Sequence, residues 1–564
     1  MNYKKSIIYS AISLGLTLGA QAQNPNYSLN GLGRSIITNS NLGGDVVQDG
    51  DNNQKASVSG YNLFDLQSNL DLDSTFNAMA ILRTRSPFGT SFGSQTKFEF
   101  RQFSMGGKLE GFKYELGDLR VEMTPYTVFN SDLAQTGYES VLFSDRKAIL
   151  EYENFNLGNS WLLQGVSGQY AWDLGNENGL GIYAFTVRTA STNEYTEPDR
   201  LMSGGRLEYG INQHMKIGIN DVYMYDVETG ASEYDQEINV LTGDFNYVRE
   251  TDDANVLFNV EGGFSNFVFS EVATGTDSSY ADATIDVDFD YGLKNKGVIL
   301  GFDFRRVGAA FTSPAAQSRR FRPDATPGLF SSIDDQLRAQ SYYDQFTSEE
   351  VYNNEVSPTL MAYNQYYNNT TPYGKATPNR MVYGLNFATD TSSKNIEASA
   401  EFNYASEIVG EGGDDLRNFM VAKGGANIHV GNLSNSDRLI DVNLGARYEN
   451  TSRGGNSSVS LTSLLIDAGL AFELVDKFDF LAGVKMFSAN GNEFIANRDG
   501  FNLVNSFSDY TIDVNETIMS VGARLRFSKK QMFNVNYNLS ALTNNDAAET
   551  IQIGQLFIHY TGKF

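Results

Sequence analysis

The feature that most constrains the fold is an alternation of apolar and polar residues with a period of two, repeated from one hairpin to the next. In IMSVGARLRF (518–527) every second residue is apolar, and the residues between them are a serine, a glycine and two arginines. After the turn SKKQ, the stretch MFNVNYNLSAL (532–542) sets apolar residues against three asparagines and a serine. Successive side chains of a strand point to opposite faces, so each strand has one apolar and one polar face. The pattern predicts an all-β protein.

Two further hairpins repeat this alternation. The stretch 464–487 alternates around a turn at 475–477, and ATIDVDFDYGL (283–293) places three aspartates on one face before the strand 297–307. A soluble sandwich would bury the apolar faces, whereas a barrel in lipid exposes them and directs the polar faces into its lumen. The alternation alone fits both architectures.

The lengths of the connections distinguish the two architectures. From about residue 280 onward, short connections alternate with longer ones. The short connections are 294–296, 390–394, 431–437, 475–477 and 528–531, and the longer ones are 308–379, 405–417, 451–458, 489–510 and 543–549. Transmembrane barrels have tight periplasmic turns and long outer loops. The sequence therefore predicts a transmembrane antiparallel up-and-down β-barrel with one long loop, 308–379, that is extracellular or folded inward.

The number of strands is less well defined at the N-terminal end. Counting backward adds strands near 254–269, 236–250, 214–225, 202–211, 179–189 and 162–173, which makes 17. Bacterial barrels of one chain have an even number of strands, so the first third must supply at least one more. There, 108–129 reads as two strands joined at Gly117-Asp118, but a periplasmic turn at that point breaks the alternation of sides with 162–173. We expect about 18 to 22 strands.

The N-terminus predicts export. Lys4 and Lys5 precede a short apolar run at 7–19, and Ala20-Gln21-Ala22 is a small-x-small cleavage site, so residues 1–22 are expected to be a signal peptide that is removed. No later segment has about 20 consecutive apolar residues, as a transmembrane helix requires.

The residues that follow the signal peptide show no periodicity. We expect 23–57 to form a periplasmic tail or partial plug, and 58–564 to form the barrel. Asp49, Asp51 and Asn53 resemble the start of a calcium loop, but the glycine and the closing glutamate are missing. A solvated acidic linker is the better reading, and no metal site is predicted.

Charge and composition exclude several classes of function. The formal net charge of −26 argues against nucleic acid as a partner, since binding phosphates requires a basic face. The absence of cysteine rules out disulfides and thiolate metal sites. The three histidines, His214, His429 and His559, are not accompanied by a nucleophile motif. We therefore expect neither an enzyme nor a cofactor.

Within a barrel, the faces opposite the aromatic residues line the lumen. Fourteen charged residues are predicted there: Arg188, Arg206, Glu208, Asp286, Asp288, Asp290, Asp303, Arg305, Arg447, Asp467, Glu473, Lys485, Arg524 and Arg526. Neighbouring strands bring opposite charges together, as with Asp288 and Arg305. Such residues either create a transverse electrostatic field across the pore that selects among polar solutes, or form local ion pairs that mainly keep the lumen hydrated.

The 308–379 loop is the largest departure from regular strand spacing. It carries Arg319, Arg320 and Arg322 near one end and a stretch compatible with a helix at 331–346. Loops of this length are functional or disordered in most proteins. The loop either narrows the lumen, docks a partner outside, or is a mobile surface loop.

Several stretches together resemble porin-like outer-membrane proteins of Bacteroidota. They are the signal peptide, the terminal YTGKF, ILRTRSPFGTSFG (81–93), FEFRQFSMGGKLEG (98–111) and YELGDLRVEMTPYTVFN (114–130). The resemblance implies a barrel surrounded by outer-membrane lipid. It also implies that the barrel-assembly machinery reads Tyr560 and Phe564 as an assembly signal.

This broad group includes diffusion channels as well as subunits of larger complexes. The first reading is a channel for passive diffusion of small polar solutes. The alternative is a non-conducting barrel subunit of a secretion or assembly complex, which docks partners through its loops and tail. Whether the chain forms a homo-oligomer stays open.

Overall fold

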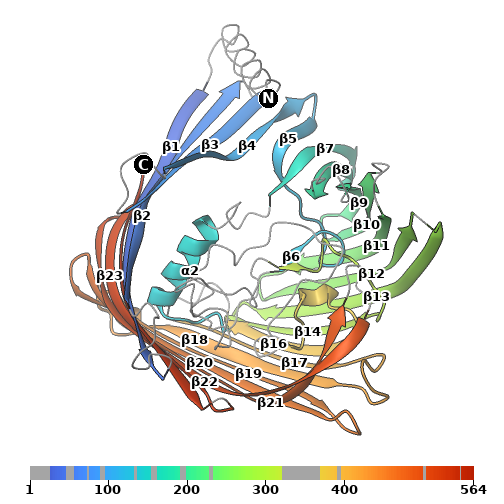
Figure 1. Cartoon of the computed structure of the whole chain (residues 1–564). Helices are drawn as coiled ribbons and strands as arrows, with labels where there is room; N and C mark the ends of the chain where they lie inside the picture. Colours follow the sequence, from blue (N-terminus) through green and yellow to red (C-terminus); the bar gives the residue numbers. More distant parts are fainter. Residues whose placement is uncertain are drawn as a thin grey trace.

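The computed structural model of the chain describes residues 26–45, 56–72, 75–88, 96–131, 136–153, 162–190, 198–227, 233–272, 274–319, 369–389, 395–498, 504–546 and 548–564. Within these ranges, 22 strands form one antiparallel sheet. The first strand, β1 (Asn26–Gly44), pairs with both β2 (Ala56–Leu72) and β24 (Glu549–Lys563), so the sheet closes into a barrel (Figure 1). The predicted antiparallel β-barrel is confirmed, at the upper end of the expected strand number.

The other strands follow one another around the wall in chain order. They are β3 (Phe76–Pro87), β4 (Lys97–Leu109), β5 (Phe112–Arg120), β7 (Leu162–Gly175), β8 (Asn178–Ala190), β9 (Asp199–Asn212), β10 (Met215–Val227), β11 (Tyr234–Glu250), β12 (Ala254–Glu271), β13 (Thr276–Leu293), β14 (Val298–Val307), β16 (Arg380–Thr389), β17 (Ile396–Ser406), β18 (Asn418–His429), β19 (Ile440–Arg453), β20 (Val459–Val475), β21 (Phe478–Arg498), β22 (Val504–Ser528) and β23 (Gln531–Asn544). Every neighbouring pair is antiparallel, as in an up-and-down barrel.

A few elements lie outside the barrel sheet. They are β6 (Asn130–Ser131), β15 (Ser318–Arg319), the helices α2 (Val141–Glu153) and α3 (Val430–Leu433), and the 3₁₀ helix η2 (Gly374–Ala376). β6 and β15 pair in parallel as a separate two-stranded sheet, and Figure 1 shows this sheet and α2 within the ring of barrel strands. None of the helices described is long and apolar enough to cross a membrane.

The prediction of a tail at 23–57 is wrong where the structure describes these residues, because Asn26–Gly44 is the barrel strand β1. The strand lacks a visible alternation because Leu32 and Ile36 point inward while Gly33 and Ser35 occupy the opposite positions. The inner face also carries Arg34 and Ser40, and the outer face carries Ile37, so both faces mix polar and apolar residues and the strand gives no amphipathic signal. The candidate calcium loop lies outside the described residues.

The turn predicted at Gly117-Asp118 is also wrong. β4 and β5 are joined at Glu110 and Gly111, which both have positive φ (48° and 93°), and Gly117 and Asp118 lie within β5. The turn at 110–111 lies at the same rim of the barrel as the turn at 176–177 between β7 and β8. Successive connections therefore alternate between the two rims, as the prediction required. The residues from 121 onward leave the wall and enter the interior, although their sequence alternates like a strand.

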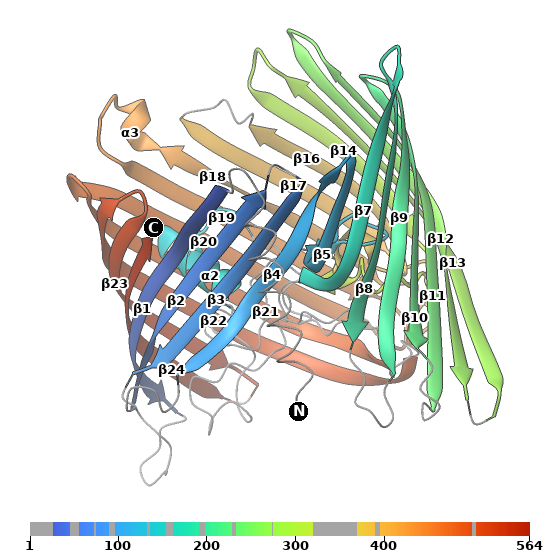
Figure 2. The ribbon, with the colours of Figure 1, turned by 90° about the horizontal axis from the view of Figure 1, so that it is seen from above.

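The connections follow the predicted alternation over the last half of the chain. Tight turns at 294–297, 476–477 and 529–530 lie at one rim, and the connections between them lie at the other. In Figure 2 the short-turn rim carries the helix α3. The long loop predicted at 489–510 is mostly wrong, because β21 extends to Arg498 and β22 begins at Val504.

Candidate functional site

The interior of the barrel is the candidate site, and part of it is filled by the chain itself. Residues 121–131, 136–153, 308–319 and 369–379 fold inward, and they have no strand partner in the barrel wall. The described residues at both ends of the 308–379 loop therefore fold into the barrel, which was one of the two predicted positions, and most of their side chains are buried. Arg320 and Arg322 lie outside the described residues, and the backbone of Arg319 belongs to β15.

An apolar core fills the interior next to strands β7 to β12, in the half that is nearer the long-loop rim. The wall contributes Leu163, Phe185, Val187, Met202, Val222, Met224, Ile238, Val240 and Phe267, and the inward segments contribute Val121, Tyr126, Val128, Phe311, Ala315, Ala316 and Ala376. Tyr126 is fully buried and its ring meets Phe311 edge-on at 6.4 Å. The expectation of a polar inner wall therefore fails in this half, because here the wall faces protein and not water.

This core corrects one predicted lumen residue. In β8 the side chains of Phe185 and Val187 point into the core, so Arg188 points outward, where it pairs with Asp199. The prediction assumed that aromatic residues face lipid on every strand. At this position the inward segments offer the aromatic ring a better-packed apolar environment.

The other thirteen predicted residues lie on the inner face, opposite exposed apolar side chains such as Phe302 and Met519. Most of them have an oppositely charged partner. Arg206 contacts Asp244 at 2.5 Å and Glu208 at 3.0 Å. Such close pairs favour local charge compensation over a transverse field for these residues.

The pair expected between Asp288 and Arg305 is not formed. Arg305 instead contacts Asp303 on its own strand, at 2.7 Å, and Asp288 contacts Lys375 of η2 at 2.5 Å. Lys375 also contacts Asp286 at 2.9 Å. Although burial alone would lower it, these two carboxylates hold the pKa of Lys375 above its usual range. The ion pairs attach the end of the long loop to β13. Asp290 follows on the same face, toward the short turn.

A track of glycines on the inner wall holds the segment 136–143. Gly425 and Gly445 are cross-strand neighbours in β18 and β19, and so are Gly469 and Gly483 in β20 and β21. A β-carbon on Gly445 would lie 2.7 Å from Thr136, and one on Gly469 would lie 2.6 Å from Ser140. Only residues without a side chain let the segment lie this close to the wall.

Ion pairs hold this segment and the helix α2 that continues it. Lys485 is almost fully buried and contacts Asp467 at 2.9 Å and Glu139 at 2.6 Å. On α2, Asp145 lies 3.7 Å from Arg524, and burial raises the pKa of Asp145 against the opposing effect of that guanidinium.

The remaining predicted residues also form pairs along the wall. Arg524 and Arg526 share the carboxylate of Asp479, at 2.9 and 2.8 Å. Arg526 contacts Glu473 at 2.8 Å, and Arg447 contacts Glu449 on its own strand at 2.9 Å.

Sequence reasoning missed a cluster around Asp65. Its buried carboxylate accepts two hydrogen bonds from Arg83, at 2.8 and 2.7 Å, and one from Arg101 at 3.1 Å. The hydroxyl of Tyr152, at the end of α2, donates to it at 2.6 Å, and the Arg101 guanidinium lies 3.9 Å from the centre of the tyrosine ring. Burial raises the pKa of Tyr152 to about 12. The alternation in 61–72 was the signal that would have placed Asp65 on the inner face.

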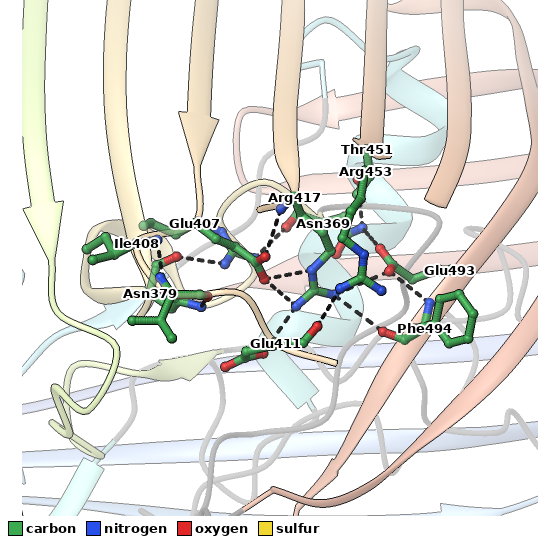
Figure 3. A network of polar contacts seen from close by, with 12 residues as sticks. Asn369, Asn379, Glu407, Ile408, Glu411, Arg417, Thr451, Arg453, Glu493 and Phe494 are labelled. Carbon is green, nitrogen blue, oxygen red and sulfur yellow. Dashed lines mark hydrogen bonds and ion pairs between the residues drawn. The ribbon is translucent and has the colours of Figure 1, made fainter. Parts of the chain in front are cut away.

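A second missed network lies at the long-loop rim (Figure 3). Arg417 donates to Glu407 at 2.7 Å and contacts Glu411 at 3.1 Å and Glu493 at 3.2 Å. Asn369 donates to the same Glu493 at 2.8 Å. The network joins the 407–417 connection, β21 and the end of the long loop. Residues so far apart in sequence give no local signal.

Comparison with known proteins adds only a general likeness of fold. No protein-family model and no curated protein matches the chain. Similar solved structures include Pseudomonas aeruginosa OccK8 (OprE), at 9% identity over 96% of this chain and 98% of that chain, with a TM-score of 0.36. A BenF-like porin from Pseudomonas fluorescens Pf-5 has 9% identity over 79% and 99%, with a TM-score of 0.35. The unliganded ferric citrate transporter FecA has 10% identity over 95% and 78%, with a TM-score of 0.42. Likeness at this level does not identify a family or a function.

Proposed function

We propose that the chain is an outer-membrane channel through which small polar solutes diffuse passively, in a lumen narrowed by its own inward segments. The observation that carries this proposal is that one closed wall separates two unlike surfaces. Outward side chains such as Phe302, Leu385 and Met519 are large, apolar and exposed, while charged side chains line the inner face of the short-turn half. A closed sheet also satisfies the backbone groups that lipid cannot hydrate.

The location follows the same proposal. After removal of the signal peptide at Ala22, the barrel would be inserted in outer-membrane lipid by the barrel-assembly machinery. Tyr560 and Phe564 are proposed as the assembly signal; both are exposed, and the Phe564 ring stacks on Phe64 at 5.7 Å. Phe564→Asp should lower the yield of heat-modifiable barrel in membranes, and Lys563→Ala is the matched control. Equal yields would remove this role.

Single-channel recording of the purified protein in planar bilayers tests conduction. We expect discrete openings of small conductance. Gly445→Val should displace the segment 136–143 and raise the conductance at least about twofold, because a side chain cannot fit beneath Thr136. Gly181→Val is the control, since a β-carbon there would meet no atom closer than 4.0 Å. Silence of wild type and both variants would overturn the channel.

The alternative function has one observation in its favour. Besides the core described above, a second buried apolar cluster on the inner face includes Leu461, Leu465, Phe487 and Ile553. A lumen filled in this way suits a non-conducting barrel that serves as a subunit of a larger secretion or assembly complex. In that case recordings would be silent and native electrophoresis of mildly solubilised membranes would show an assembly larger than the barrel. A homo-oligomer would be recognised by the same measurement.

A further inference from the structure

A hollow lies on the inner wall at the short-turn rim. Its volume is about 300 Å³, and residues of β11, β12, β13 and β14 line it. Two of the lining residues, Asp290 and Gly292, share a face of β13 with Asp286 and Asp288, which point into the lumen. None of the lining residues belongs to the inward segments 121–131, 136–153, 308–319 and 369–379. The hollow is therefore separate from the part of the interior that these segments fill.

Gly292 lies in the hollow, and no described neighbour requires a glycine at this position. Its φ is not positive, and it pairs in regular register with Asn255 of β12 and Ile299 of β14. A β-carbon on Gly292 would lie 3.5 Å from Asn255 and 3.7 Å from Ile299, which are ordinary van der Waals distances. A glycine inside a strand weakens the strand and often marks the close approach of a ligand or of another backbone. In the same barrel, Gly445 and Gly469 make room for an inward segment.

Apolar side chains flank this glycine. Val248 and Leu257 are cross-strand neighbours, as are Gly292 and Ile299, and all of them line the hollow. Although Val248 lies on the inner face, 50% of it is exposed, and Leu257 and Ile299 are partly exposed. Covering such apolar surface removes it from water, which is favourable. The hollow therefore suits the apolar part of a solute.

A carboxylate without a cation lies next to the apolar surface. A β-carbon on Gly301 would meet Oδ1 of Asp290 at 2.2 Å, so the Asp290 side chain lies over this second glycine. Among the described residues Asp290 takes part in no ion pair, because Lys375 contacts the two preceding aspartates of β13. Lys294, at the rim, contacts Glu250 at 2.6 Å. The polar group that the hollow offers to a solute is thus an anion.

We propose that this hollow binds small organic cations, with a primary ammonium group on Asp290 and a short alkyl chain over Gly292, between Val248 and Ile299. Asp290 and Gly292 are two residues apart, or about 7 Å along the strand, which is the length of a chain of about five carbons. The formal net charge of −26 also raises the local concentration of cations. This inference rests on the proposed channel, because the solute reaches the hollow through the lumen.

Isothermal titration calorimetry of the wild-type barrel in lipid nanodiscs tests the site with n-pentylammonium. At pH 7 an alkylamine carries its proton, as lysine does. Pentanoate is the matched control solute, since it has a chain of the same length and the opposite charge. We expect n-pentylammonium to bind at least about fivefold more tightly than pentanoate. Equal affinities, or tighter binding of pentanoate, would overturn the proposal.

Two variants separate the contribution of the carboxylate from that of the hollow. Asp290→Asn should weaken the binding of n-pentylammonium at least about fivefold and abolish its advantage over pentanoate. Gly292→Val should weaken the binding of n-pentylammonium because the new side chain occupies the hollow. Asp221→Asn is the control, since it removes one carboxylate from the outer face of β10. Heat-modifiable migration checks that each variant forms the barrel.

The comparison of these variants decides the proposal. Partition of the solute into lipid is common to all the proteins, so it cancels between them. Wild-type affinity in Asp290→Asn or in Gly292→Val would overturn the site, and so would an equal loss in Asp221→Asn.

Channel recordings distinguish a failure of the site from a failure of the channel. If the barrel conducts, n-pentylammonium should lower the single-channel current of wild type and not that of Asp290→Asn. Silent recordings together with the expected binding would overturn the channel and support the site. Open channels without the expected binding would overturn the site and leave the channel.

Discussion

The wall from β20 to β24 and the wall from β3 to β7 are built from strands of the same kind, but they differ in how far neighbours are paired. β21 and β22 pair through 21 residue pairs, whereas β4 and β5 pair through six. In the first wall, inward side chains such as Lys485 and Arg524 contact the docked residues Glu139 and Asp145. In the second the chain itself turns inward at Arg120. The difference shows that residues used for an internal core are lost to the wall.

The largest loss of unfolding free energy is expected in the wall from β20 to β24. Lys485→Ala would leave the carboxylate of Asp467 buried without its cation, which costs about 3–5 kcal/mol of unfolding free energy. Urea unfolding in lipid, followed by heat-modifiable migration, measures this loss. The double variant Lys485→Met/Asp467→Leu should recover most of it, because no charge at 467 remains unpaired. A loss below about 1 kcal/mol in the single variant would mean that water reaches this site.

A smaller loss of stability, which depends on pH, is expected at Tyr152, which contacts the inner face of the wall near β4. The folded protein keeps the Tyr152 phenol neutral to about pH 12, whereas an unfolded tyrosine loses its proton near pH 10. Stability should therefore fall as the pH rises from about 10 to about 12, by about 2–3 kcal/mol from this group. The variant Tyr152→Phe should lack that part of the pH dependence. Parallel curves for the two proteins would contradict the buried hydrogen bond to Asp65.

The smallest loss of stability is expected where the pairing between β4 and β5 ends. Asp118→Ala removes the acceptor of the Phe103 amide and should cost about 1 kcal/mol. Because the loss is local, exchange of the amides in 104–106 should accelerate more than global unfolding does. Asp118→Asn keeps an acceptor and serves as the control. Identical exchange in all three proteins would show that the carboxylate does not stabilise the end of the β4–β5 pairing.

The candidate site was predictable in part. Strand alternation placed Asp286, Asp467 and Lys485 on one face, and these residues do contact the inward segments. The partners Lys375 and Glu139 were not predictable, because they belong to segments with no periodicity that are distant in sequence. Arg188 was misplaced for a related reason, since an aromatic face signals an apolar neighbour without saying whether that neighbour is lipid or protein.

By itself the sequence determined the barrel class and the strands from β7 onward. Each of these strands carries its own alternation of apolar and polar residues, and short polar connections mark the tight turns between them. Only the tertiary structure decided that 26–44 is a wall strand and that 121–129, which alternates equally well, is not. β1 is selected by pairing on both edges with β2 and β24, and 121–129 by burial against Phe185, Met202 and Phe311. Both outcomes depend on contacts between residues far apart in the chain, and a local pattern of apolar and polar residues does not encode which partner it will meet.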